Sequence, residues 1–524
     1  MKYFEHLLLW TISYLLVLSL FSCSTKEKKS DSFRPNILFI PVDDLRPELG
    51  CYGDEYIKTP RIDKLAEQGV TFTRTYCQQA VCNPSRASLL TGLRPDSIKV
   101  WDLYTDFRKN VPDVITLPQF FKQNGYTTIG LGKTFHNNIP DSISWTVKLH
   151  VDGFPFDPDA VYMTEENRKI QEQKKQKIIE VGKSRIDQLG YWYIKANATE
   201  IADVDDDAYY DGAQTTRALQ VLQELKDQKK PFFLSVGYYR PHLPFNAPKK
   251  YWDMYNRDSI PLATNQYPPV GNPPYAVHGD AELRGYSDCH DLPFPADIPW
   301  DENRQRELKH GYYASVSYID TQIGRLLDGL KQMGLAENTI VILWGDHGWK
   351  LGEHNGWCKQ DNYEIDTRVP LIVSGAGVKA KGKQSDALTE FVDIYPTLCE
   401  MAGFPIPDHL QGTSLIPLLE NPDIAWKTAA FSQFLLGRFG PKEMRRQQRM
   451  GYTIRTERYR YVEWYNWNEE SDTKGEFLTS ELYDHFNDPQ ENENLAYEAE
   501  YKKKVDLLSD KLRMGWRYAK LTAH

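Results

Sequence analysis

The chain has 524 residues, enough for one large domain with an appendage or for two or three ordinary domains. Hydrophobic residues make up 41% of it and charged residues 26%, which is typical of a globular protein and argues against a fibre or a multi-span membrane protein. The 63 basic and 72 acidic residues give a net charge of -9, which disfavours nucleic acid as a partner but leaves an anionic substrate open, because a local cluster of cations can govern one pocket.

The N-terminus carries an export signal. An apolar run from Leu7 to Phe21 is shorter than the roughly twenty residues that span a membrane, and it ends at small residues. Leu20-Phe21-Ser22-Cys23 resembles a bacterial lipobox. We therefore predict a signal peptide over residues 1–22, a lipid anchor on Cys23, a tether over 23–33, and a bacterial protein of the periplasm or outer membrane. An ordinary cleaved signal peptide is the alternative.

Short apolar strands then alternate with helices, a pattern that predicts an α/β fold with a mixed or parallel sheet covered on both faces. We assign this part, residues 34–424, to a catalytic domain. The expected strands are 36–42, 127–131, 232–236, 339–344 and 369–373, and the expected helices are 60–69, 117–124, 211–226, 307–333 and 393–402. The charged segment 163–183 reads as a locally helical, solvated insertion.

From about residue 425 the pattern changes. Residues 450–456 and 459–464 alternate in polarity as two antiparallel strands joined by a short turn do. A third strand is expected at 482–485 and a closing helix at 498–513. The economical interpretation is a smaller C-terminal α+β subdomain over residues 425–524.

Acidic residues follow two of the predicted strands, at Asp43-Asp44 and at Asp346-His347. In open α/β sheets, sites gather at the carboxyl ends of the strands. Three carboxylates that converge there repel one another unless a cation compensates them, which favours a hard divalent metal with oxygen ligands. Each acidic pair taken alone could instead begin a turn or cap a helix.

Cys82-Asn83-Pro84-Ser85-Arg86 is the decisive segment, and it continues to Leu90-Thr91-Gly92. It resembles the signature Cys-x-Pro-x-Arg of the formylglycine-dependent sulfatases, in which the cysteine is oxidised to an aldehyde. A helix that begins near Ser85 would point free amide groups at an anion. Apart from Cys23 and Cys82 the other five cysteines are scattered and odd in number, which fits neither a disulfide framework nor a zinc site, although one bridge is possible.

Three further basic residue groups follow predicted strands or the second acidic motif. Lys133 and His136 follow the strand at 127–131, His242 lies in Arg240-Pro241-His242, and Lys359 lies beyond Asp346-His347. A single loop histidine or lysine is usually a solvated surface residue. Their positions after successive strands favour a site for an anion instead.

The resemblance covers most of the chain, and within the sulfatases it is strongest to the iduronate-2-sulfatase subfamily. It continues through Tyr312-Ala314-Ser315-Val316-Ser317-Tyr318, Gly352-Glu353-His354 and Ile454-Arg455-Thr456. It implies an alkaline-phosphatase-like fold, with a central mixed sheet flanked by helices. It also implies a sulfated saccharide as substrate, such as a 2-sulfated uronic acid of a glycosaminoglycan or the uronate and rhamnose sulfates of ulvan, and a formylglycine-generating enzyme as a maturation partner.

The resemblance further implies a role for each candidate residue. Calcium would be held by Asp43, Asp44, Asp346, His347 and the modified Cys82. Arg86 would hold the aldehyde hydrate and a metal carboxylate, and Lys133 and Lys359 would bind the sulfate oxygens. His242 would protonate the departing sugar oxygen, and His136 would take the proton that releases sulfate.

Two alternatives stay open at this point. One is a phosphatase, phosphodiesterase or phosphonate hydrolase of the same fold, although those typically use Ser or Thr with two zinc ions. The other is a non-catalytic, carbohydrate-binding pseudo-sulfatase in which Cys82 stays unmodified.

Overall fold

A computed structural model describes residues 34–137, 139–154, 161–181, 195–277, 279–292, 298–438 and 447–519. The predicted signal peptide, the tether and Cys23 lie outside the described residues. Among the described residues, no helix is both long enough and apolar enough to cross a membrane.

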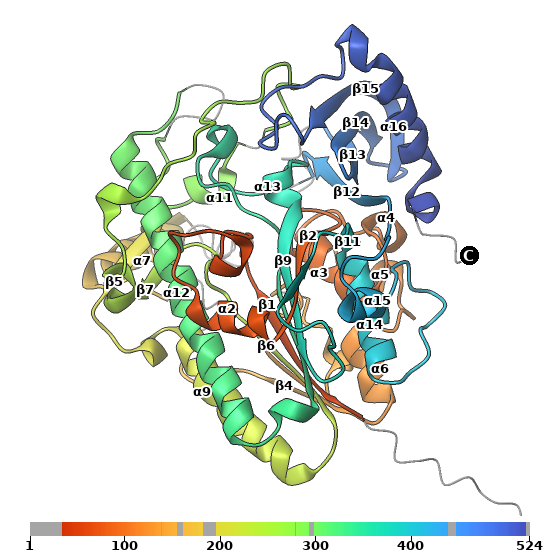
Figure 1. Cartoon of the computed structure of the whole chain (residues 1–524). Helices are drawn as coiled ribbons and strands as arrows, with labels where there is room; N and C mark the ends of the chain where they lie inside the picture. Colours follow the sequence, from red (N-terminus) through yellow and green to blue (C-terminus); the bar gives the residue numbers. More distant parts are fainter. Residues whose placement is uncertain are drawn as a thin grey trace, which may run out of the picture. The chain divides into compact units, whose positions relative to one another are not determined.

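A nine-stranded mixed sheet forms the centre of the structure (Figure 1). Its order is β10-β2-β9-β8-β1-β6-β3-β4, with β11 paired to β2. Most neighbours are parallel, whereas β9 runs antiparallel to both β8 and β2. The strands are β1 (Asn36–Val42), β2 (Gly69–Tyr76), β3 (Thr127–Gly132), β4 (Val147–Leu149), β6 (Phe232–Gly237), β8 (Thr339–Gly345), β9 (Arg368–Gly375), β10 (Lys383–Ser385) and β11 (Thr389–Glu390). The predicted α/β class with a mixed sheet is confirmed.

Helices cover both faces of this sheet, and the alternation along β1 explains why. Leu38, Ile40 and Val42 belong to the apolar cluster that contains α9 (Tyr210–Gln228) and α12 (Glu302–Gln332). Ile37 and Phe39 belong to the opposite cluster, with α3 (Cys82–Thr91), α6 (Leu117–Gln123) and α14 (Ile394–Met401). A strand buried on both faces reads as a nearly continuous apolar run, as Ile37 to Val42 of β1 do.

The remaining helices are shorter or lie at the periphery. They are α2 (Pro60–Glu67), α4 (Pro95–Ile98), α5 (Phe107–Asn110), α7 (Glu165–Val181), α10 (Lys249–Trp252), α11 (Ala281–Arg284), α13 (Glu364–Thr367), α15 (Ile416–Glu420) and α16 (Lys502–Met514). A two-stranded sheet pairs β5 (Thr199–Ala202) with β7 (Phe245–Pro248).

The C-terminal part folds as a four-stranded antiparallel sheet against α16 (Figure 1). The strands are β12 (Ala429–Leu436), β13 (Arg449–Thr456), β14 (Tyr459–Asn468) and β15 (Thr473–Asp484). The predicted hairpin corresponds to β13 and β14. The third strand is longer than expected. β12 was not predicted, because its sequence has no marked apolar alternation. β2 in the main sheet was not predicted either, although Val70, Phe72 and Tyr76 alternate with threonines there.

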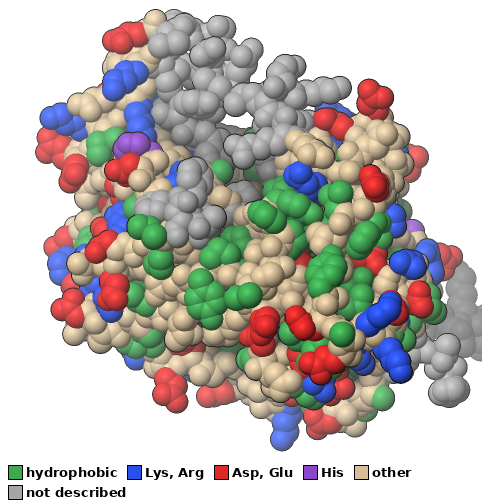
Figure 2. Space-filling model, turned by 90° about the horizontal axis from the view of Figure 1, so that it is seen from above, with side chains coloured by type: hydrophobic (Ala, Val, Ile, Leu, Met, Phe, Trp, Pro, Cys, Tyr) green, Lys and Arg blue, Asp and Glu red, His purple; other side chains and the backbone are tan. Residues whose placement is uncertain are grey.

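Acidic and basic side chains are interspersed on the face of the molecule in Figure 2, and the described part of that face carries no continuous basic patch. The six described cysteines are all free thiols, so the disulfide that the sequence left open does not form among them.

Candidate active site

Cys82 is the first residue of α3, where free backbone amides meet the carboxyl ends of the central strands. The helix begins here and not near Ser85, with Val81 in an extended conformation before it. Cys82 is 2% exposed, and its Sγ lies 3.2 Å from His347 Nε2. Burial raises the pKa of the thiol well above its usual value, so an unmodified Cys82 would be a protonated thiol and a poor nucleophile.

Three carboxylates converge beside Cys82 because β1 and β8 are parallel neighbours. Val42 pairs with Gly345 at the end of these strands, so Asp43 and Asp44 leave the sheet next to Asp346. Asp44 N donates to Asp346 Oδ1 at 3.0 Å. None of the three carboxylates has exposed surface.

Arg86 lies one turn into α3 and joins two of these carboxylates. Its Nη2 is 2.8 Å from Asp43 Oδ1, and its Nε is 2.9 Å from Asp346 Oδ2. The guanidinium is almost completely buried, so the ion pairs hold α3 against the ends of β1 and β8. The sequence expectation that Arg86 contacts metal-site carboxylates agrees with this geometry.

Two lysines form ion pairs with the carboxylates of Asp43 and Asp44. Lys133, after β3, pairs with Asp43, and Lys359 Nζ lies 2.8 Å from Asp44 Oδ1. Burial alone would raise the pKa of Asp43, but the charges of Lys133 and Arg86 hold it well below its usual value. No more than 3% of the surface of either lysine is exposed, so an anion that entered here would meet two desolvated cations.

The carboxylates, His347 and Cys82 form a set that fits a divalent metal. His347 Nε2 lies 3.4 Å from Asp44 Oδ1 and 3.6 Å from Asp346 Oδ1. Ligand atoms of Asp44, Cys82 and His347 lie within 4.8 Å of one another, as do those of Asp43, Cys82 and Asp346. Three buried carboxylates in so small a volume are the donors that a hard cation such as Ca²⁺ prefers.

His242 lies at the edge of this cluster and contacts a residue that the sequence analysis missed. Its Nδ1 is 2.7 Å from Leu243 O, and its Nε2 is 2.8 Å from the carboxylate of Glu282, on α11. Glu282 also lies 3.0 Å from Lys359 Nζ, so it bridges two of the expected catalytic cations. Burial alone would raise the pKa of Glu282, but Lys359 and His242 hold it well below its usual value.

No sequence signal singled out Glu282. It lies on a helix of four residues in a stretch without apolar periodicity, where an acidic residue is usually a solvated surface group. A buried histidine and lysine need a carboxylate partner, but the sequence does not indicate which acidic residue provides it.

His136 lies on the loop after β3, near Lys133. Burial, followed by the charge of Lys133, lowers its pKa well below the usual value, so the ring is neutral and able to accept a proton. Its Nδ1 is buried and makes no hydrogen bond within the described part of the protein. The structure thus brings all the sequence-predicted site residues to one end of the sheet.

Comparisons with known proteins agree with this arrangement. A family model described as Sulfatase matches residues 35–404, and one described as N-sulphoglucosamine sulphohydrolase, C-terminal, matches residues 352–516. The chain is 33% identical to an iduronate 2-sulfatase of Mus musculus over 94% of this chain and 96% of that protein. It is 31% identical to a sulfatase of Formosa agariphila over 94% of this chain and 90% of that protein.

The fold comparison points the same way. A solved structure in complex with its substrate, D-glucosamine-2-N,6-O-disulfate, has a TM-score of 0.69 and 25% identity to this chain. The match covers 92% of this chain and 97% of that one.

Proposed function

Since the chain belongs to the sulfatase family of sulfuric ester hydrolases, we propose that it cleaves sulfate esters of a sulfated saccharide through a formylglycine made from Cys82. The observation that carries this proposal is the position of Cys82. It begins a helix, is buried, and faces three carboxylates, two lysines and Arg86. A formylglycine-generating enzyme is the maturation partner that this chemistry requires.

In the proposed reaction, each of the residues around Cys82 has a separate role. When present, an aldehyde hydrate at residue 82 supplies two geminal hydroxyls, one to attack sulfur and one whose deprotonation expels sulfate. Lys133 and Lys359 bind the sulfate oxygens and stabilise the charge that develops as the ester bond breaks. His242 donates a proton to the departing sugar oxygen. His136, whose ring is neutral, accepts the proton whose loss releases sulfate.

Asp43, Asp44, Asp346 and His347, together with residue 82, would hold one divalent metal, which we propose is Ca²⁺. When bound, the metal offsets the mutual repulsion of the buried carboxylates and offers positive charge to the sulfate. Arg86 keeps Asp43 and Asp346 oriented whether or not a metal is bound, because it contacts both directly.

The proposed substrate is a sulfated polysaccharide or its oligosaccharides, with 2-sulfated uronic acids of glycosaminoglycans and the uronate and rhamnose sulfates of ulvan as candidates. The similarity to an iduronate 2-sulfatase supports a uronic acid. Sulfate release from a panel of defined uronate, glucosamine and rhamnose sulfates tests the choice of sugar.

We also propose a bacterial lipoprotein: a signal peptide over residues 1–22, a lipid on Cys23, a tether over 23–33, a catalytic domain over 34–424 and a C-terminal subdomain over 425–524. Its location would be the periplasm or the outer membrane. Globomycin, which blocks lipoprotein signal peptidase, should cause an unprocessed precursor to accumulate. Processing that globomycin does not change would favour the alternative, an ordinary cleaved signal peptide.

Mass analysis of the tryptic peptide that contains residue 82 tests the central proposal. Protein expressed with a maturation enzyme should carry an aldehyde in place of the thiol, and Cys82→Ala should release no sulfate. Full activity from protein that retains a free thiol contradicts the mechanism. A modified protein that hydrolyses phosphate esters faster than sulfate esters, or an unmodified one that only binds glycans, would select one of the two alternatives.

A further inference from the structure

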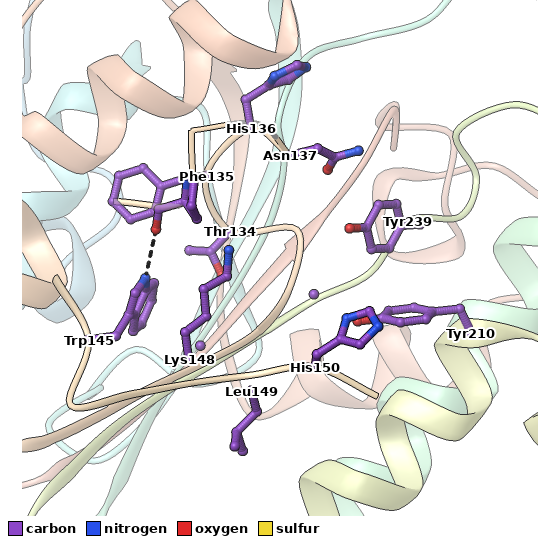
Figure 3. A pocket seen from close by; sticks show the side chains of 13 residues that line it. Thr134, Phe135, His136, Asn137, Trp145, Lys148, Leu149, His150, Tyr210 and Tyr239 are labelled. Carbon is purple, nitrogen blue, oxygen red and sulfur yellow. Dashed lines mark hydrogen bonds between the residues drawn. The ribbon is translucent and has the colours of Figure 1, made fainter. Parts of the chain in front are cut away.

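A second pocket lies beside the catalytic residues, at the edge of the main sheet (Figure 3). It has a volume of about 240 Å³, close to that of eight water molecules at about 30 Å³ each, and so has room for roughly one sugar ring. Gly130 and Gly132 of β3 are among the residues that line it. A Cβ on Gly130 would come within 2.9 Å of the Trp145 ring, so the missing side chain lets the indole pack close to the strand.

Aromatic side chains form the walls of this pocket. Trp145 and Phe135 lie on one side, and Tyr210 and Tyr239 lie on the other in an edge-to-face pair with centroids 5.3 Å apart. All four are buried by neighbouring side chains. Walls of this kind pack against the apolar face of a sugar ring.

The polar groups of the pocket are suited to an anion. Lys148 lies on the edge strand β4 opposite Gly130, and Figure 3 shows its side chain extending along the pocket wall toward Thr134. The Tyr239 hydroxyl points into the pocket, and the Tyr210 hydroxyl lies beside the His150 ring (Figure 3). No carboxylate lies among the described residues that line the pocket. A cation and several hydrogen-bond donors without an acidic counterpart favour a negatively charged ligand.

Two buried atoms also lack partners here. His136 Nδ1 and Asn137 Oδ1 are shielded from solvent, and neither makes a hydrogen bond within the described part of the protein. Buried polar atoms are almost always satisfied by protein groups, ordered water or a ligand, and a polar ligand in this pocket would offer partners to these two. Sugar hydroxyls both donate and accept, and could satisfy both atoms.

The pocket adjoins the catalytic centre through two shared residues. His136 lines the pocket and interacts electrostatically with Lys133, Asp43 and Arg86. The Tyr239 ring centroid lies 5.8 Å from Lys133 Nζ, while its hydroxyl faces the pocket. A saccharide with its sulfate at the lysines therefore has a second, aromatic compartment next to it.

We propose that this pocket is a subsite for an anionic sugar residue of the substrate, with Lys148 pairing an oxyanion on that sugar. The inference rests on the proposed sulfatase function and deepens it, because it makes the favoured substrate an oligosaccharide with a second negative charge. The oxyanion is either a uronate carboxylate or a second sulfate, and both offer the same chemistry to an ammonium group.

The test compares Lys148→Met with Lys383→Met. Lys383 is an exposed lysine on β10, the opposite edge strand of the same sheet, and so is a matched control. The substrates are a monosulfated uronate disaccharide, its carboxyl-reduced analogue, which keeps only the charge of the scissile sulfate, and that analogue with a second sulfate. Lys148→Met should raise the KM of a disaccharide with a second negative charge about tenfold or more relative to the carboxyl-reduced one, and Lys383→Met should not. Tyr210→Phe should weaken the same preference.

The disaccharide that responds identifies the oxyanion: the uronate indicates a carboxylate, and the doubly sulfated analogue indicates a sulfate. Equal KM values for Lys148→Met and wild type on every substrate overturn the proposal. If the wild type releases no sulfate from any ester, the proposed function fails. The subsite is then tested separately by calorimetry, with the unsulfated uronate disaccharide and Cys82→Ser protein with or without Lys148→Met. Binding that Lys148→Met weakens about tenfold or more supports the subsite, and unaffected binding refutes it.

Discussion

Arg460 offers a sharp test of how the C-terminal sheet supports the catalytic centre. It lies on β14 with no exposed side-chain surface. Its guanidinium contacts Glu491 Oε1 at 2.6 Å, Glu364 Oε2 at 2.5 Å and Asn362 O at 2.9 Å. Asn362 belongs to the loop that carries Lys359, so one buried side chain links the C-terminal sheet to the loop of a residue that we propose binds sulfate.

Arg460→Met should be strongly destabilising. The change leaves the buried Glu491 and the partly buried Glu364 with less compensation, although Arg455 still pairs with Glu364 and His485 with Glu491. Removing one partner of a buried ion pair costs about 3–5 kcal/mol, a large share of the 5–15 kcal/mol that typically separates folded from unfolded protein. With an m-value of about 3–5 kcal/mol/M, the urea midpoint should fall by roughly 1 M.

Arg458→Met is the matched control. Arg458 lies two residues away and also forms an ion pair, with Asp484 at 2.5 Å, but its side chain is 40% exposed. The Asp484 carboxylate is itself buried, but Phe486 N and Asn487 Nδ2 still donate to it when Arg458 is removed. Because water and salt screen the exposed guanidinium, this variant should unfold close to the wild-type midpoint. Tryptophan fluorescence at fixed calcium measures both midpoints. Similar shifts for the two variants would refute the reasoning, because burial is the property that separates them.

Three further predictions concern the proposed catalytic centre and the buried Glu481 of the C-terminal sheet. His242→Ala should reduce kcat/KM for sugar sulfates by about 10²–10⁴, with a much smaller loss for aryl sulfates, whose leaving groups need no proton. Glu282→Gln should also lower kcat/KM for sugar sulfates more than for aryl sulfates, by about tenfold. Equal losses on both substrates would exclude His242 and Glu282 from proton donation. Dialysis against a chelator should abolish sulfate release and added Ca²⁺ should restore it, whereas activity that survives complete metal removal, verified by elemental analysis, would exclude an essential cation. Burial raises the pKa of Glu481 to about 7 from 4.5. Since the folded pKa is the higher one, the free energy of unfolding should fall by about 3 kcal/mol between about pH 4.5 and pH 7, and pH-dependent urea titrations of Glu481→Gln should lack that fall.

Much of the fold was predictable because its strands and helices carry strong local signals. The almost entirely apolar sequences of β1 and β8 predict strands covered on both faces, and the long periodic stretch of α12 predicts a helix. β12 was missed because its sequence mixes polar and apolar residues without clear alternation, and its identity as a strand depends on the neighbour with which it pairs. β2 was missed although Val70, Phe72 and Tyr76 alternate with threonines, which is a local strand signal.

The site residues divide in the same way. The sequence by itself determined the chemical types, since the segment from Cys82 to Arg86 and the acidic pairs after β1 and β8 each stand out in a short stretch. Only the tertiary structure decided which groups meet. Glu282 lies beside His242 and Lys359, and Lys148 lines the same pocket as Tyr210, although these residues come from segments far apart in the chain. Buried charges and pockets are properties of packing, because desolvation and proximity depend on distances in space that no local pattern encodes.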